Sequence, residues 1–221
     1  MPTAGRPRRP RRTCCAPGPT TEPRADREIP SGGESHEGEG TSRGFTVLQV
    51  PVPAVESFVR DRYEHYDRAY LSADPAFTHA HITVLAPFLP APDPAALGVV
   101  GAILAGTEPI TFELRRLETF PNGVIYLAPE PAEPFRRLTE RFVAAFPQCL
   151  PYGGAFADIV PHVTLDQRSA EVSVESTRDR LGTTVPVTCV ADRVDLAWYE
   201  PHRCRVLTSW PLGGPSRPGY S

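Results

Sequence analysis

Two segments of this 221-residue chain carry the same short pattern: a histidine, a threonine two positions later, and then an aliphatic residue. The first is "HITV" at 81–84 and the second is "HVTL" at 162–165. Both runs are apolar enough for buried strands, and a strand points residues i and i+2 to one face. The histidines are 81 residues apart, about half of the folded part of the chain. The repeat predicts a duplicated α+β unit with one His-x-Thr strand per half.

The segments around the motifs alternate strand and helix signals. Strands are expected where apolar and polar residues alternate, and helices where apolar residues recur at helical spacing. The expected strands are 45–53, 79–86, 110–115, 124–128, 161–165, 185–199 and 204–210. The expected helices are 54–72, 92–107, 131–147 and 171–181. This order indicates two lobes related by an approximate two-fold axis, with the motif strands near each other at the junction.

The domain boundaries follow from composition. Before Phe45 the only branched aliphatic residue is Ile29, so residues 1–44, rich in proline, glycine and arginine, are expected to be disordered. Residues 45–210 form the expected domain, with lobes at about 45–118 and 119–210. Residues 211–221 are expected to be a tail.

Charge and cysteine usage restrict the class of partner. The N-terminal segment holds 8 arginines against 6 acidic residues, which leaves a net charge of −5 for the rest of the chain. That balance argues against an extended duplex-binding face but permits a pocket for a small anion. No run approaches the roughly 18 apolar residues of a membrane span. The five cysteines form no C-x-x-C pair, which is typical of a reduced, cytoplasmic protein. We expect a monomer.

The paired motifs suit chemistry at a phosphodiester. On each strand the histidine and threonine share a face, so His81 with Thr83 and His162 with Thr164 could surround one phosphate. Histidine gives and takes protons near neutral pH, and two of them supply a general base and a general acid together. The threonine hydroxyls can donate to the non-bridging oxygens. We therefore expect catalysis by the histidines and phosphate binding by the threonines, with no metal or other cofactor.

Five further residues are weaker candidates for the pocket. His79 shares the strand face of His81 and could line the rim. Phe88, Tyr126 and Tyr152 could stack on a base, although core packing explains an aromatic residue equally well. Arg168, shortly after the second motif, could help to neutralise a phosphate.

The two motifs resemble the paired H-x-[ST]-hydrophobic signature of the 2H phosphoesterase superfamily, the 2′-5′ RNA ligase-like proteins. The flanking segments "AHITVLAPF" and "PYGGAFADIVPHVTL" are similar to its bacterial 2′-5′ RNA ligase-like branch, over residues 45–210. The resemblance implies a bilobal fold with antiparallel sheets facing a central cleft and helices outside. It also implies metal-free opening of a 2′,3′-cyclic phosphate to a 2′-phosphate, with RNA ends or small cyclic nucleotides as substrates and 2′-5′ RNA ligation as a related activity.

Two alternatives remain open from the residues alone. The acidic body and the "APF" continuation of the first motif leave room for a nucleotide- or RNA-binding module without turnover. A zinc site formed by His79, His81 and His162 is a second alternative, because an H-x-H pair on one strand can chelate a metal. Which histidine is the base stays undecided at this stage.

Overall fold

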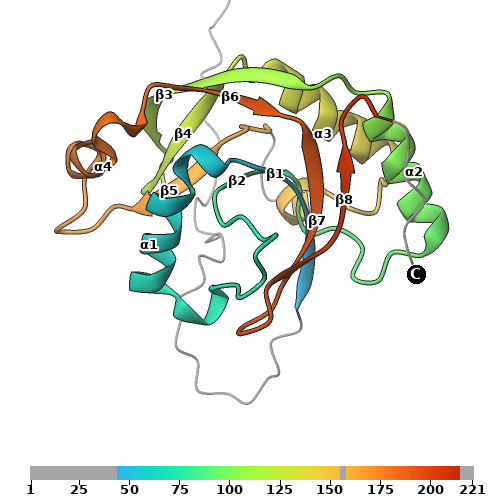
Figure 1. The fold of residues 1–221 in the computed structure, drawn as a ribbon, viewed down its shortest axis with the longest axis horizontal. Coiled ribbons are helices and arrows are strands. Elements are labelled where there is room, and N and C mark those ends of the chain that lie inside the picture. Colours follow the sequence, from blue (N-terminus) through green and yellow to red (C-terminus); the bar gives the residue numbers. More distant parts are fainter. Residues whose placement is uncertain (1–43, 155–157, 215–221) are drawn as a thin grey trace, which may run out of the picture.

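The computed structural model describes residues 44–154 and 158–214. All of the segment 1–44 except Gly44, for which disorder is predicted, therefore lies outside the described residues, as does part of the expected tail. Within these ranges, eight antiparallel strands form one curled sheet in the order β6-β3-β4-β5-β2-β1-β7-β8 (Figure 1). The strands are β1 (Phe45–Pro51), β2 (His81–Leu85), β3 (Ile110–Thr119), β4 (Val124–Glu130), β5 (Val163–Gln167), β6 (Val187–Ala191), β7 (Arg193–Tyr199) and β8 (Arg205–Pro211).

Four α-helices accompany this sheet in the described part of the chain: α1 (Glu56–Tyr66), α2 (Pro94–Ala105), α3 (Glu133–Ala145) and α4 (Val174–Leu181). Local sequence explains where two of them begin. Asp93 caps α2 by accepting from the Ala96 N–H at 2.7 Å, and a proline follows it in the first turn. Ser173 and Ser176 form a reciprocal capping box at the start of α4. No helix of the described ranges is long and apolar enough to cross a membrane.

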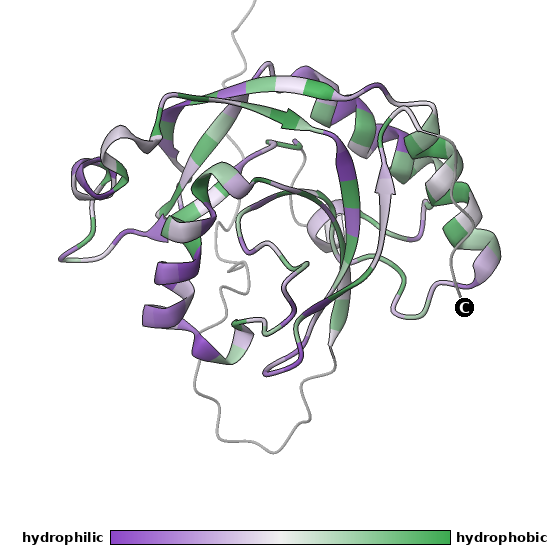
Figure 2. Ribbon diagram, in the orientation of Figure 1, coloured by the Kyte–Doolittle hydropathy of each residue, from purple (hydrophilic) through white to green (hydrophobic). Residues whose placement is uncertain are grey.

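The helices pack against one face of the sheet and build the main core there. Buried residues of α3, including Phe135 and Phe142, join Ile82 of β2 and Val163 of β5 in one hydrophobic cluster. Figure 2 shows α2 as predominantly hydrophobic and α1 as largely hydrophilic, and α1 buries Val59 together with the charged residue Arg62. The α+β class and the antiparallel strands are confirmed.

The two halves of the sheet meet where β2 pairs with β5. One half contains β2, β1, β7 and β8, and the other contains β5, β4, β3 and β6. The first strand and the last two strands of the described chain therefore lie in the same half, whereas the sequence predicted a sequential division near residue 118. That position also lies inside β3.

Several boundaries differ from the sequence-based expectation by a few residues, and two differences are larger. The segment 185–199 forms two strands rather than one. Its first part, β6, pairs with β3; after Asp192 the chain crosses the sheet, and its second part, β7, pairs with β1. The first helix ends at Tyr66 instead of Ser72, since Asp67 leaves the helical backbone region (φ −150°, ψ 65°) and a short 3₁₀ turn follows.

Candidate active site

The two motif strands lie side by side at the centre of the sheet. Ile82 of β2 and Val163 of β5 are direct antiparallel partners. Extending this register by one residue to either side sets each motif histidine opposite the threonine of the other motif. We call the sheet face that carries His81, Thr83, His162 and Thr164 the motif face. The prediction that the two motif strands meet at the junction of the halves is confirmed.

Both motif strands contain the same irregularity. The pairing register shifts by one residue directly after the motif threonine, so that Val84 in β2 and Leu165 in β5 are extra residues without a cross-strand partner. Such a bulge lets the extra residue and the next one both turn toward the helices, and Val84 and Leu85 are accordingly both buried. The aliphatic residue that ends each motif is thus packed in the hydrophobic core, on the side of the sheet opposite the motif face.

The two imidazoles are held in the same way. The Nδ1 atom of His81 lies 2.7 Å from the carbonyl oxygen of His79, and Nδ1 of His162 lies 2.7 Å from that of Val160. A carbonyl oxygen only accepts hydrogen bonds, so both Nδ1 atoms carry the proton in the neutral ring. This tautomer leaves Nε2 as the nitrogen that can take a proton from a substrate or water. The site therefore presents two equivalent proton acceptors.

A buried polar network supports His81 from within its own half of the sheet. The Tyr199 hydroxyl donates to Oε1 of Gln49 at 2.7 Å and lies 3.4 Å from Nδ1 of His81. Gln49 is the cross-strand partner of Thr83, and its amide donates to the Thr78 carbonyl at 3.3 Å. The network fixes the position of Gln49 beside the motif.

Aromatic side chains surround His162. Phe120 meets its ring edge-on at 4.9 Å between centroids, and Tyr126 lies at 5.4 Å. These two rings stack on each other at 4.1 Å, and the Tyr126 hydroxyl donates to Glu118 at 2.8 Å. Tyr126 is the cross-strand partner of Thr164. Tyr126 therefore lies beside the second motif, as the pocket hypothesis requires.

Burial controls the protonation of both motif histidines. The pKa of His81 is lowered to about 4: desolvation is the main cause, the charge of His162 adds to it, and the bond to the His79 carbonyl opposes it. Desolvation also lowers the pKa of His162, against the bond to the Val160 carbonyl. Both rings are consequently neutral at pH 7 in the unliganded protein.

Tyr152 reaches the first motif from the loop after α3. Its side chain is hydrogen-bonded to Thr83, and its backbone N–H donates to the Ala86 carbonyl at 2.7 Å. Tyr152 has a left-handed backbone conformation (φ 51°, ψ 34°), which is costly for a bulky side chain and is maintained by these contacts. The expectation that Tyr152 lies near the site agrees with this geometry.

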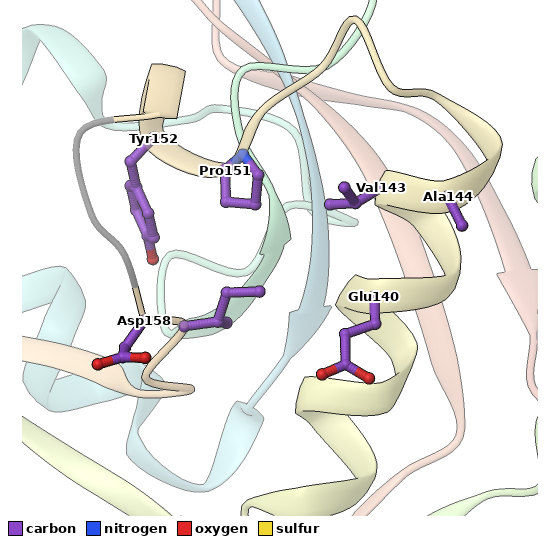
Figure 3. A pocket seen from close by; sticks show the side chains of 7 residues that line it. Glu140, Val143, Ala144, Pro151, Tyr152 and Asp158 are labelled. Atoms are coloured by element: carbon purple, nitrogen blue, oxygen red, sulfur yellow. The ribbon is translucent and has the colours of Figure 1, made fainter.

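Tyr152 also lines a cavity of about 320 Å³ between its loop and α3. Figure 3 shows Tyr152, Pro151 and Asp158 on one wall, and Glu140, Val143 and Ala144 of α3 on the other. Carboxylates on both walls would repel a phosphate. We therefore place the phosphate on the motif face and not in this cavity.

The other three weaker candidates lie elsewhere. Phe88 belongs to the core, where it meets Phe146 edge-on at 5.0 Å, so it is not a pocket residue. Arg168 is exposed just after β5, and its charge acts on Glu175 at the start of α4. Within residues 44–154 and 158–214, no recorded contact directs either side chain toward the motif face. Each residue follows a motif closely along the chain, so the sequence suggested that it lies near the site, but nearness in sequence does not show where a side chain points.

His79 is a structural residue and not part of a pocket rim. It is 2% exposed; Nε2 accepts from the Ser72 N–H at 3.1 Å, and Nδ1 lies 2.7 Å from Glu56. Both ring nitrogens are therefore occupied, which leaves no lone pair for the zinc site considered above. Within 44–154 and 158–214, no group of three or more His, Cys, Asp or Glu residues is arranged to hold a metal.

Helix α1 supplies two charged residues to the motif strands that sequence reasoning missed. Glu56 accepts hydrogen bonds from His79 and from the Ala80 N–H, just before β2. Arg62 forms a buried two-pronged ion pair with Asp166 of β5, with contacts of 2.8 and 3.2 Å. The partners are 24 and 104 residues apart along the chain, so no local pattern could indicate either contact.

Comparison with known proteins places these observations in a family. The family model described as "2′-5′ RNA ligase superfamily" matches residues 51–203. No curated protein matches the chain. Among solved structures, TT0787 of Thermus thermophilus is 20% identical, with a TM-score of 0.50, and the alignment covers 77% of this chain and 98% of that one. LigT of E. coli complexed with 3′-AMP is 17% identical, with a TM-score of 0.46 and coverage of 78% and 99%. The similarity to TT0787 supports the fold.

Proposed function

Because the chain belongs to the 2′-5′ RNA ligase superfamily, we propose that it is a metal-independent phosphodiesterase acting on a nucleotide or an RNA end. The favoured reaction opens a 2′,3′-cyclic phosphate to a 2′-phosphate. The observation that carries this proposal is the matched pair of motif histidines, each with Nδ1 bonded to a backbone carbonyl at 2.7 Å. Two imidazoles that present Nε2 on one sheet face can act on opposite sides of one phosphorus atom.

The proposed reaction is an in-line displacement by water. Nε2 of one histidine takes a proton from water as its oxygen attacks phosphorus, and the bond from phosphorus to the 3′-oxygen breaks. The second histidine, protonated beforehand, donates its Nε2 proton to the departing 3′-oxygen. Thr83 and Thr164 donate their hydroxyl protons to the non-bridging oxygens and stabilise the charge that develops there.

Substrate binding favours uptake, from the solvent, of the proton that the acid needs. Both histidines are neutral in the free protein, and a phosphodiester anion placed between them favours an imidazolium. The charge of His162 acts against protonation of His81, so the pair takes up one proton more readily than two. One acid and one base result, which is the state that the displacement requires.

Ligation is the related activity of the same site. A 5′-hydroxyl of a second RNA end would replace water as the attacking group, and the cyclic phosphate would become a 2′-5′ linkage. The same histidines and threonines would serve both reactions.

The test is turnover of the four nucleoside 2′,3′-cyclic monophosphates in EDTA. We compare the wild type with His81→Ala and His162→Ala, and use His65→Ala, on the exposed side of α1, as a matched control. Conversion to 2′-phosphates should fall by about 10²–10⁴-fold in each motif variant and not in the control. Full activity of His162→Ala would refute the proposal. Tight binding of a 2′-phosphorylated ligand without turnover would favour the binding module.

A further inference from the structure

A single peptide group connects Glu56 to His81. The peptide unit between residues 79 and 80 consists of the His79 carbonyl and the Ala80 N–H. Its carbonyl oxygen accepts from Nδ1 of His81 at 2.7 Å, and its N–H donates to Oε2 of Glu56 at 2.8 Å. The carboxylate, the peptide and the imidazole therefore form one continuous chain of hydrogen bonds.

The other oxygen of Glu56 fixes this arrangement. Oε1 lies 2.7 Å from Nδ1 of His79, whose Nε2 accepts from the Ser72 N–H, so the His79 ring is a neutral donor to Glu56. Partial burial opposes ionisation of Glu56, but the bonds from His79 and Ala80 lower its pKa overall. Glu56 is thus a carboxylate at neutral pH, with its two oxygens on the imidazole and the backbone of residues 79–80.

A hydrogen-bond chain that ends in a carboxylate is polarised along its length. The negative charge at Glu56 draws the Ala80 N–H, which increases electron density on the His79 carbonyl oxygen. That oxygen becomes a stronger acceptor for Nδ1–H of His81. Stronger acceptance at Nδ1 stabilises the imidazolium that forms when Nε2 takes a proton, as a carboxylate behind histidine does in hydrolytic triads.

The second motif cannot have the same support. Its imidazole is bonded to the Val160 carbonyl, and the next residue is Pro161, which has no backbone N–H. The peptide unit behind His162 therefore has no donor for a carboxylate. The two histidines share a tautomer and a place in the motif, but only the peptide unit behind His81 has an N–H for a carboxylate.

We propose that Glu56 is a positioning residue that acts through the 79–80 peptide to stabilise the protonated form of His81, and that Pro161 denies this support to His162. The kinetic part rests on the proposed function, and the spectroscopic part does not. The other titratable groups around His81 are His162, which directly precedes β5, His79, and Tyr199 of β7. Glu56 is the carboxylate among them, and its charge raises the pKa of His81 against the larger effect of burial.

The direct test measures the Nδ1–H proton resonances of the two motif histidines by NMR, assigned from the single His→Ala variants. Glu56→Gln removes the charge, and should move the His81 resonance upfield while the His162 resonance stays unchanged. Glu64→Gln, on the exposed side of the same helix, is the matched control and should move neither. Glu56→Asp is the second variant, since its shorter side chain cannot reach both His79 and Ala80; it should shift the His81 resonance in the same direction.

The kinetic test uses a 2′,3′-cyclic nucleotide. In Glu56→Gln, kcat should fall about tenfold with little change in KM, because the substrate contacts stay in place. An unmoved His81 resonance in folded Glu56→Gln or Glu56→Asp would overturn the proposal, as would equal shifts of both histidines. A shifted His81 resonance in a protein without turnover would support the Glu56 proposal and refute the proposed function.

Discussion

Loss of the Asp166 charge should destabilise the protein more than loss of any exposed carboxylate. The side chains of Arg62 and Asp166 are 7% and 1% exposed, and the guanidinium makes contacts of 2.8 and 3.2 Å to both carboxylate oxygens. Asp166→Asn preserves the shape but leaves the arginine charge buried without its partner. Breaking one side of such a pair costs about 3–5 kcal/mol. We expect the free energy of unfolding to fall by that amount.

Urea denaturation measures this loss, with the midpoint and slope fitted together. Asp61→Asn is the control on the same helix, because Asp61 and its partner Arg180 are 65% and 49% exposed. An exposed pair of this kind contributes about 0–1 kcal/mol. Replacing both buried partners, as Arg62→Met with Asp166→Leu, should recover most of the stability, since no charge is then left buried. A loss below about 1 kcal/mol for Asp166→Asn would refute the reasoning.

Three further outcomes are expected. Burial is the main cause that lowers the pKa of His81 from 6.5 to about 4. Between pH 6.5 and about pH 4, His81 is therefore protonated in the unfolded chain and neutral in the folded protein. Stability should therefore fall by roughly 3 kcal/mol as pH drops from about 6.5 to about 4, and His81→Asn should flatten this slope in urea titrations at several pH values. Phe135→Ala should cost about 3–5 kcal/mol, because the ring is buried against Phe112 at 5.2 Å; calorimetry would show the lower Tm. Ser173→Ala removes the cap of α4 and should cost about 1 kcal/mol by the same method, whereas an unchanged Tm would contradict the capping role.

Local patterns in the sequence predicted the parts of the fold that depend on neighbouring residues. Alternation around Ile82 and Val163 identified both motif strands, and the apolar spacing over 131–147 identified α3. The break at Asp192 was missed because both sides of it alternate in the same way, and only the sheet order separates them. Periodicity shows which residues form a strand but not which strand lies next to it.

The same limit applies to the site. The histidines and threonines could be proposed as a site because their pattern is repeated, and a repeat can be seen in the sequence itself. The contacts of Glu56 and Arg62 could not be predicted, since a charged residue on a helix is ordinarily solvated and nothing in the local sequence marks its partner. His79 was misplaced for a related reason. The expected strand alternation placed the His79 side chain on the same face as His81, whereas the Glu56 carboxylate of α1 holds it in the interior.

The paired-histidine mechanism is tested most directly by a double-mutant cycle in kcat for a 2′,3′-cyclic nucleotide. Groups that act together on one displacement lose most of their effect when either is removed. We predict that His81→Ala and His162→Ala each reduce kcat by about 10²–10⁴-fold, and that the double variant is little slower than the worse single variant. Multiplicative losses, or a double variant that retains wild-type turnover, would contradict the account.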